Sequence, residues 1–235
     1  MNKHYASPDV SVDIVLLTLK AGKLHVALHV REKEPCLGRL ALPGGYVHVD
    51  DANEADLEAT AYRVLKEKTG LVPRYLEQLK TFSGKERDPT RGWTVAVSHV
   101  ALIPLEELAA VGEGVFHFYD VDALPELAFD HAKQVAEAVQ RVRNKSNYST
   151  LPCWLLPERF TLTQLQHTYE EILGETWPRA TFRSRLGIKV GDVKPGESAD
   201  NADILVATEE YQRGNQRPAR LFGVNQLSLL KRTFW

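Results

Sequence analysis

The chain has 235 residues, of which 43% are hydrophobic and 26% are charged, and its formal net charge at pH 7 is −2. This composition is that of an ordinary water-soluble globular protein, and the length allows two domains or one large one. Because the net charge is close to zero, a molecule-wide basic surface is excluded, so any site for nucleic acid must be a local patch.

Two further features concern where the protein works. No uninterrupted apolar run reaches membrane-spanning length, and the first nine residues lack the apolar segment of a signal peptide. Cys36 and Cys153 are far apart in the sequence and lack the spacing of a metal site, which favours reduced, buried thiols. We therefore expect a cytoplasmic protein with no membrane partner.

The first part of the chain mixes predicted strands and helices. Residues 10–18 and 24–30 are β-branched and partly alternating, and the turn-like Lys-Ala-Gly-Lys segment at 20–23 predicts a hairpin between them. Residues 130–143 have apolar side chains at helical spacing. The other elements expected here are a short strand at 40–47, a helix at about 56–69, and strands at 75–82 and 93–103.

The helix expected at 56–69 carries the most informative motif. Aligned from Gly70-Leu71, it resembles the Nudix box, whose pattern is Gly, five residues, Glu, seven residues, then Arg-Glu-apolar-x-Glu-Glu-x-Gly-apolar. Arg63 and Glu67 match this pattern, whereas Val64 and Lys68 stand where the family has glutamates.

The loop before this helix also departs from the pattern. The segment from Gly45 to Arg63 is about four residues longer than the pattern requires, so the first Glu falls near Ala55. Glu54 and Asp56 are possible stand-ins for it. The alternative is an unrelated amphipathic helix, whose core stripe would be Leu57, Ala61 and Leu65.

The substitutions in the motif change its chemistry. Positions 64, 67 and 68 share one helix face, and in active Nudix enzymes the resemblance implies three carboxylates there that hold the cations bridging a diphosphate. A lysine ammonium about 4 Å from a divalent cation would be repelled by roughly 8 kcal/mol at an effective dielectric constant near 20. We therefore predict no catalytic metal site and no hydrolysis, and we expect Lys68 to meet a phosphate oxygen directly.

A composition shift divides the chain. Residues 144–158 contain turn formers and two prolines without periodicity, so we expect one domain at 1–150 and a second at 151–235. Residues 161–173 predict a helix with an apolar stripe, Thr161 or Thr163 as its N-cap, and Gly174 as its end.

A second helix is expected at 178–186, with Thr176 as its cap and Phe182 and Leu186 facing inward. Strands at 204–212 and 218–224, joined by a polar tip, then predict a wing, so that the second domain is a winged helix-turn-helix.

Cations are segregated in this second domain. Residues 179–189 contain four cations and no carboxylate, and residues 213–220 contain three arginines and no carboxylate. Such a surface suits DNA, because arginine binds phosphate and guanine edges in a bidentate manner. The alternative is a solvated arginine-rich face on a helical oligomerisation domain. The expected DNA contacts are Arg179, Thr181, Arg183, Ser184, Arg185, Arg213, Asn215 and Arg217.

Further segments extend the resemblance over nearly the whole chain, which is identified as a member of the Nudix-related transcriptional regulator family, NrtR. Residues 87–91 resemble the family's Arg-Asp-Pro-Arg segment, and residues 127–131 resemble its Leu-Ala-Phe-Asp-His signature. Phe182-Arg183 falls where the family's recognition helix has Asn-Phe-Arg, with Thr181 in place of Asn. Residues 217–220 match its wing strand, with Gln216 in place of His.

The resemblance implies an α/β (α+β) fold, with a Nudix-type mixed sheet between helices followed by the winged helix. It also implies a homodimer that represses NAD biosynthesis or salvage genes at a palindromic double-stranded operator. The effector would be ADP-ribose or a related NAD-derived nucleotide, and no cofactor is expected. The residues expected to bind the effector are Arg39, Gly44, Gly45, Arg63, Glu67, Lys68, Arg87 and Arg91.

Two other functions are compatible with the same sequence. The first is an active Nudix pyrophosphatase for ADP-ribose-like substrates, with Glu54, Asp56 and Glu58 as replacement metal ligands. The second is a nucleotide-binding scaffold that does not touch DNA. For His131, at the start of a helix, we expect a structural role rather than that of a general base.

Overall fold

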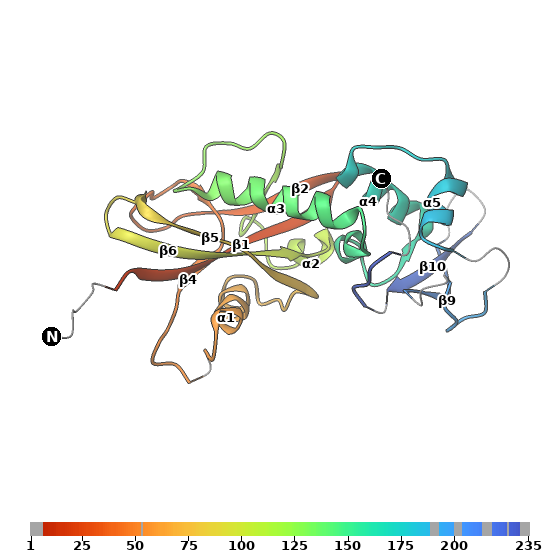
Figure 1. The fold of residues 1–235 in the computed structure, drawn as a ribbon, viewed down its shortest axis with the longest axis horizontal. Helices are drawn as coiled ribbons and strands as arrows, with labels where there is room; N and C mark the ends of the chain where they lie inside the picture. The colour runs from red at the N-terminus through yellow and green to blue at the C-terminus, as the bar shows by residue number, and fades with distance from the viewer. Residues whose placement is uncertain are drawn as a thin grey trace. The chain divides into compact units, whose positions relative to one another are not determined.

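The computed structural model describes residues 7–52, 54–188, 193–199, 204–212, 218–224 and 226–230 (Figure 1). The chain forms two compact units. The first consists of Met1–Thr18, His25–Ile103 and Glu107–Val139, and the second consists of Leu19–Leu24, Pro104–Glu106 and Gln140–Trp235. Neither unit is therefore a single uninterrupted stretch of chain.

The first unit is built on a mixed sheet. Its main path has the order β3-β2-β1-β6-β5, while β4 pairs with β1 and β7 pairs with β2. β1 and β6 are parallel, and the other described pairs are antiparallel. The strands are β1 (Asp9–Lys20), β2 (Lys23–Val30), β3 (Leu40–Ala41), β4 (Gly44–Tyr46), β5 (Tyr75–Asp88), β6 (Gly92–Leu102) and β7 (His117–Asp120).

β1 lies in the middle of this sheet because its sequence suits burial on both faces. Residues 12–18 are buried without interruption, which is the pattern of a strand covered by helices on both sides. The predicted hairpin to β2 is present: Ala21 and Gly22 have φ angles of 51° and 77°, and two positive φ angles are typical of a type I′ turn.

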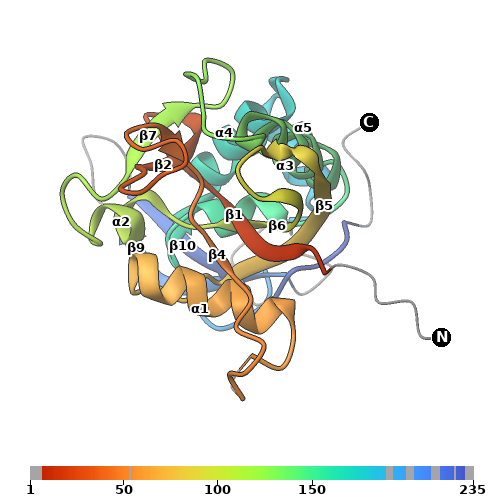
Figure 2. The same cartoon turned by 90° about the vertical axis from the view of Figure 1, so that its left-hand side faces the viewer.

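Helices cover both faces of the sheet. α1 (Leu57–Thr69) and the first part of α3 (His131–Ser146) lie on opposite sides of it (Figures 1 and 2). α1 begins where the Asp56 carboxylate accepts a hydrogen bond from the Ala59 amide (2.8 Å), and it ends at Gly70, which has a φ of 69°. Ala61 and Leu65 of α1 pack in the core with strand residues such as Ile14.

Some elements differ from the sequence-based expectations. The single strand expected at 40–47 is divided into β3 and β4 around Pro43, which has no amide hydrogen to donate to the sheet, although its carbonyl accepts from Ile14 (2.9 Å). β5 continues to Asp88, six residues beyond the expected end at 82. β7 and the short helix α2 (Leu105–Ala109) were not expected, because both are too short to show a periodic pattern.

The second unit contains the predicted winged helix. Its antiparallel sheet has the order β8-β10-β9, and its core includes Phe160, Leu165, Tyr169, Phe182 and Ile204. The elements are η1 (Leu151–Leu155), β8 (Phe160–Thr161), α4 (Leu162–Leu173), α5 (Arg179–Arg185), β9 (Leu205–Gln212) and β10 (Ala219–Val224). The expected order of two helices followed by a hairpin is therefore confirmed.

The tip of the β1–β2 hairpin belongs to this second unit. Leu19 packs against its apolar core, and the Leu24 amide donates to the Glu171 carboxylate of α4 (3.0 Å). No helix among the described residues is long and apolar enough to cross a membrane.

The two helices of the helix-turn-helix begin differently. Thr161, not Thr163, caps α4: its hydroxyl accepts from the Gln164 amide (3.1 Å), and the Gln164 side chain accepts from the Thr161 amide (2.8 Å). The expectation that Thr176 caps α5 is wrong, because the N-cap is Pro178 and makes no side-chain hydrogen bond.

Thr161→Ala should destabilise the second unit by about 1 kcal/mol, since it removes the hydroxyl that accepts from the Gln164 amide. Thr163→Ala, two residues along on the exposed face, should cost only a few tenths of that. Urea unfolding followed by circular dichroism measures both, and equal losses would contradict the assigned cap.

Candidate functional site

The three metal-binding positions of the Nudix motif do not form a cation site in this chain. Val64 is only 1% exposed and belongs to the hydrophobic core. A Cβ atom on Gly45 would lie 2.8 Å from a Val64 methyl carbon, so the glycine backbone and Val64 are in close contact. Glu67 and Lys68 are exposed, and Glu67 binds Arg63 (3.1 Å). A divalent cation prefers several oxygen ligands. Here Glu67 is paired with Arg63, Lys68 is positively charged and Val64 has no ligand atom, so these three side chains do not fit such a cation.

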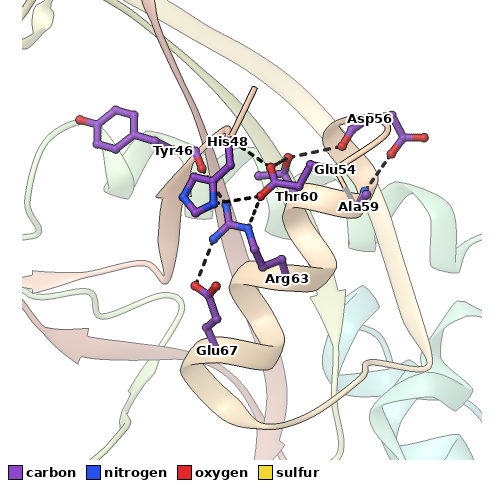
Figure 3. Close-up of polar contacts among 8 residues, drawn as sticks. All are labelled: Tyr46, His48, Glu54, Asp56, Ala59, Thr60, Arg63 and Glu67. Atoms are coloured by element: carbon purple, nitrogen blue, oxygen red, sulfur yellow. Dashed lines mark hydrogen bonds and ion pairs between the residues drawn. The ribbon is translucent and has the colours of Figure 1, made fainter. Parts of the chain in front are cut away.

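Arg63 holds the inserted loop against α1 (Figure 3). Its Nε donates to Glu54, its Nη1 donates to Glu67 (3.1 Å), and its Nη2 donates to the Tyr46 carbonyl (2.7 Å). All three nitrogens of the guanidinium are thus engaged within the protein. Arg63 therefore positions the loop through Glu54. That Glu54 or Asp56 stands in for the first glutamate of the motif stays a prediction.

Glu54 is the centre of this contact. Its side chain is 2% exposed and accepts hydrogen bonds from the Thr60 hydroxyl (2.6 Å) and the His48 amide (3.1 Å) as well as from Arg63. Burial alone would raise the pKa of Glu54, but these hydrogen bonds and the charge of Arg63 outweigh it and lower the pKa from 4.5 to about 2. The carboxylate is therefore ionised throughout the neutral range.

A second arginine joins two motifs that are distant in the sequence. Arg87, from β5, donates to Asp13 of β1, and its Nε lies 3.2 Å from an Asp130 carboxylate oxygen. Gln134 of α3 donates to both carboxylates, at 2.8 Å to Asp13 and 3.0 Å to Asp130. The Arg-Asp-Pro and Leu-Ala-Phe-Asp-His segments therefore meet in one network, in which Arg87 and Asp13 are each 9% exposed.

Asp13, Asp130 and Gln134 were not among the site residues expected from the sequence, although Asp130 belongs to the Leu-Ala-Phe-Asp-His segment. Asp13 also had a detectable signal, because it is an acid inside an otherwise apolar strand, and a buried carboxylate requires a partner. The side chain also explains Gly44: a Cβ atom there would lie 2.5 Å from an Asp13 carboxylate oxygen.

His131 has the structural role expected of it. Its Nδ1 accepts from the Leu42 amide (3.0 Å), which leaves the proton on Nε2, 3.7 Å from Asp13. Burial lowers the pKa of His131, so the ring is neutral near pH 7.

A pocket of about 330 Å³ opens beside this network. Two of its residues, Cys36 and Phe129, have φ angles of 66° and 52°, a left-handed conformation that side chains of this size rarely adopt. Strained backbone of this kind is concentrated at functional sites. The lining residues are Pro35, Cys36, Glu86, Arg87, Pro89, Thr90, Phe129, Asp130 and Lys133.

Of the eight residues expected to bind the effector, Arg87 alone lines this pocket. Arg39 pairs with Glu126 (2.8 Å) at the surface. Arg91 lies over the Tyr46 ring (4.9 Å to the centroid) and pairs with Asp9 (3.2 Å). Their roles in binding stay predictions, as do those of the two glycines, Arg63, Glu67 and Lys68.

α5 presents the predicted basic face. Phe182 is 1% exposed and meets Tyr169 edge-on, with ring centroids 5.6 Å apart, which fixes the rotation of the helix. Of the α5 residues expected to contact DNA, four are exposed: Arg179, Thr181, Arg183 and Ser184. Arg185 is half-buried, with its guanidinium 5.9 Å from the Trp177 ring centroid.

The wing is described only in part. The expected contacts Arg213, Asn215 and Arg217 lie outside the described residues. Arg220, counted among the wing cations, donates to the Thr208 carbonyl of β9 (2.8 Å) and to the Val193 carbonyl, so its guanidinium is engaged within the protein.

Both units match known families. The NUDIX domain matches residues 7–142, and the NrtR DNA-binding winged helix domain matches residues 152–189.

Individual relatives cover most of the chain. It is 36% identical over 222 residues to the ADPR responsive transcriptional repressor NtrR of Acinetobacter baylyi, across 93% of this chain and 82% of that protein. The crystal structure of Shewanella oneidensis NrtR complexed with a 27mer DNA has a TM-score of 0.78 and 34% identity, covering 92% of this chain and 93% of that one. An ADP-ribose pyrophosphatase of Methanocaldococcus jannaschii is 34% identical over 134 residues, 57% of this chain and 74% of that protein.

The lowered pKa of Glu54 predicts a pH-dependent stability. A carboxylate whose pKa is depressed on folding contributes stability above its ordinary pKa of 4.5, and this contribution is lost as the pH falls toward about 2. Glu54→Gln should therefore be less stable than the native protein at pH 7 and should lose less between pH 5 and pH 3. Urea midpoints across this range measure the effect. Glu58→Gln, an exposed change in the first turn of α1, should follow the native profile, and a Glu54→Gln curve parallel to it would contradict the prediction.

Proposed function

Because the chain belongs to the NrtR family of Nudix-related transcriptional regulators, we propose that it is a DNA-binding repressor controlled by ADP-ribose or a related NAD-derived nucleotide. In this proposal a homodimer binds a palindromic operator of genes for NAD biosynthesis or salvage. The first unit binds the nucleotide without hydrolysing it, and the second unit binds DNA.

The observation that carries DNA binding is the exposed face of α5 within a winged helix. Arg179 and Arg183 are one turn apart on this face, and the first turn of α5 contains no acid. In helix-turn-helix proteins the second helix enters the major groove, where arginine binds guanine edges and flanking phosphates. A merely solvated arginine face would not need Phe182 and Tyr169 to fix which side chains point outward.

The pocket beside Arg87 is our candidate for the effector site. Its volume of about 330 Å³ is within the range of small-molecule sites. Arg87 and the exposed Lys133 supply positive charge for a diphosphate, and Phe129 supplies an aromatic ring. A diphosphate bound there would compete with the carboxylates of Asp13 and Asp130 for the Arg87 guanidinium. Asp13 lies in β1, and Asp130 directly precedes α3.

Hydrolysis is the alternative, favoured by the similarity to an ADP-ribose pyrophosphatase. Two of the three replacement ligands, Glu54 and Asp56, are already engaged, however. Glu54 is bound by Arg63, Thr60 and His48, and Asp56 caps α1. Lys68 adds positive charge on the face where the catalytic cations would lie.

The DNA-binding proposal predicts that the protein retards double-stranded DNA from upstream of its own operon, and that ADP-ribose releases it. Arg183→Ala should weaken binding by roughly tenfold, the cost of one good arginine contact. Lys66→Ala, which removes one exposed charge from α1, is the control and should change little. If the dimer neutralises about six to ten phosphates, log affinity should fall against log salt with a slope of roughly −5 to −9. No retardation at low salt would contradict the proposal.

The position of the effector can be tested by two lysine variants. Lys133→Ala should raise the ADP-ribose concentration needed for release several-fold without changing DNA affinity, because Lys133 lines the pocket. Lys68→Ala tests the competing expectation that the phosphate lies against α1. A larger effect of Lys68→Ala would move the effector site from the pocket to α1. Release of AMP from ADP-ribose with Mg²⁺ at an enzyme-like rate would favour the hydrolase instead.

A further inference from the structure

α5 lacks the usual means of starting a helix. It has only seven residues, its N-cap Pro178 makes no side-chain hydrogen bond, and its first turn has no acidic residue. A helix of this length is unstable in isolation, because the cost of nucleation is repaid by few hydrogen bonds. Its direction must therefore be set by contacts from outside the helix.

Two side chains of α4 supply such contacts at the residue before the cap. Gln166 Nε2 donates to the Trp177 carbonyl (2.7 Å) and to Glu170 Oε1 (2.8 Å), and the same Glu170 oxygen accepts from the Trp177 amide (3.0 Å). Both backbone polar groups of Trp177 are thus held by side chains one turn apart on α4. Pro178 follows with a φ of −57° fixed by its ring, so the direction in which the chain enters α5 is determined.

The second fixed point is Phe182, which packs on Tyr169, the neighbour of Glu170 in α4. Phe182 alone would fix the rotation of α5 but would leave its N-terminal end to pivot. Holding Trp177 as well sets the tilt, and Arg179 lies only two residues farther along the chain.

We infer that Gln166 and Glu170 are positioning residues for DNA recognition: they replace the missing cap of α5 and aim its arginines without touching DNA themselves. The inference rests on the proposed function. It assigns to this pair a share of the selectivity for one DNA sequence over another, because base contacts are sensitive to helix direction whereas phosphate attraction is not.

The chemistry of the pair provides matched variants. Glu170→Gln keeps an oxygen that can accept both hydrogen bonds, so it should behave as the native protein does. Gln166→Glu is nearly isosteric, but it replaces the donor by a carboxylate facing the Trp177 carbonyl and Glu170, so the contact should break. Thr176→Glu adds the same charge at an exposed neighbouring position and controls for repulsion of DNA.

The first measurement is amide hydrogen exchange on the full chain. In Gln166→Glu the amides of Trp177 and α5 should exchange at least about tenfold faster than in Glu170→Gln and Thr176→Glu, as loss of a buried hydrogen-bonded contact implies. The amides of the second half of β10 should be unchanged, which excludes global unfolding. Equal exchange in all three variants would overturn the inference without reference to DNA.

The second measurement is the ratio of affinities for upstream operon DNA and for a scrambled duplex at the same salt concentration. Gln166→Glu should lower this ratio by about tenfold relative to Thr176→Glu, and Glu170→Gln should keep it. If the native protein discriminates and Gln166→Glu discriminates equally well, the positioning role is wrong while the proposed function stands. If the native protein itself does not discriminate, the proposed function fails first, and the hydrogen-exchange result alone decides whether the contact orders α5.

Discussion

The guanidinium of Arg87 lies between the carboxylates of Asp13 and Asp130 and supplies positive charge to both. Asp13 is buried in the central strand, and Asp130 directly precedes α3, so the strand, the helix and β5 are joined by one set of charged contacts. Removing one partner of such an arrangement leaves an uncompensated charge, which costs about 3–5 kcal/mol. The network therefore ties together the walls of the pocket, and the strained backbone of Phe129 beside it is held in place by the same elements.

Arginine serves two separate purposes in this protein, and the surroundings decide which. Three arginines donate hydrogen bonds to carboxylates and carbonyls of the protein itself: Arg63, Arg87 and Arg220. Arg179 and Arg183, in contrast, are exposed on a short helix whose apolar side is fully used by Phe182. The first group stiffens loops and hairpins, and the second is left to interact with an anionic partner.

The sequence was sufficient for the order of the longer elements, because apolar periodicity, turn residues and helix ends are local properties, whereas β7 and α2 are too short to show a period. The choice between Thr161 and Thr163 as a cap required the structure, since either hydroxyl stands at a plausible distance from the helix start. The candidate site was harder to predict from the sequence, because its contacts join segments that are far apart in the chain. Arg63 was found through its motif, yet its partner Glu54 is displaced by the longer loop, and Asp13 meets Arg87 across 74 positions. A single sequence carries no record of such pairings.

The participation of Leu19–Leu24 in the second unit has a consequence for dissecting the molecule. A cleavage near residue 150 would cut the backbone once, but it would not separate the two units. The second unit also contains the hairpin tip and Pro104–Glu106, which precede the cut. A fragment starting there would lose the packing of Leu19 against the apolar core and the hydrogen bond from the Leu24 amide to Glu171. Nicked protein should consequently migrate as one particle under native conditions, and grafting the second unit onto another protein would require carrying the hairpin with it.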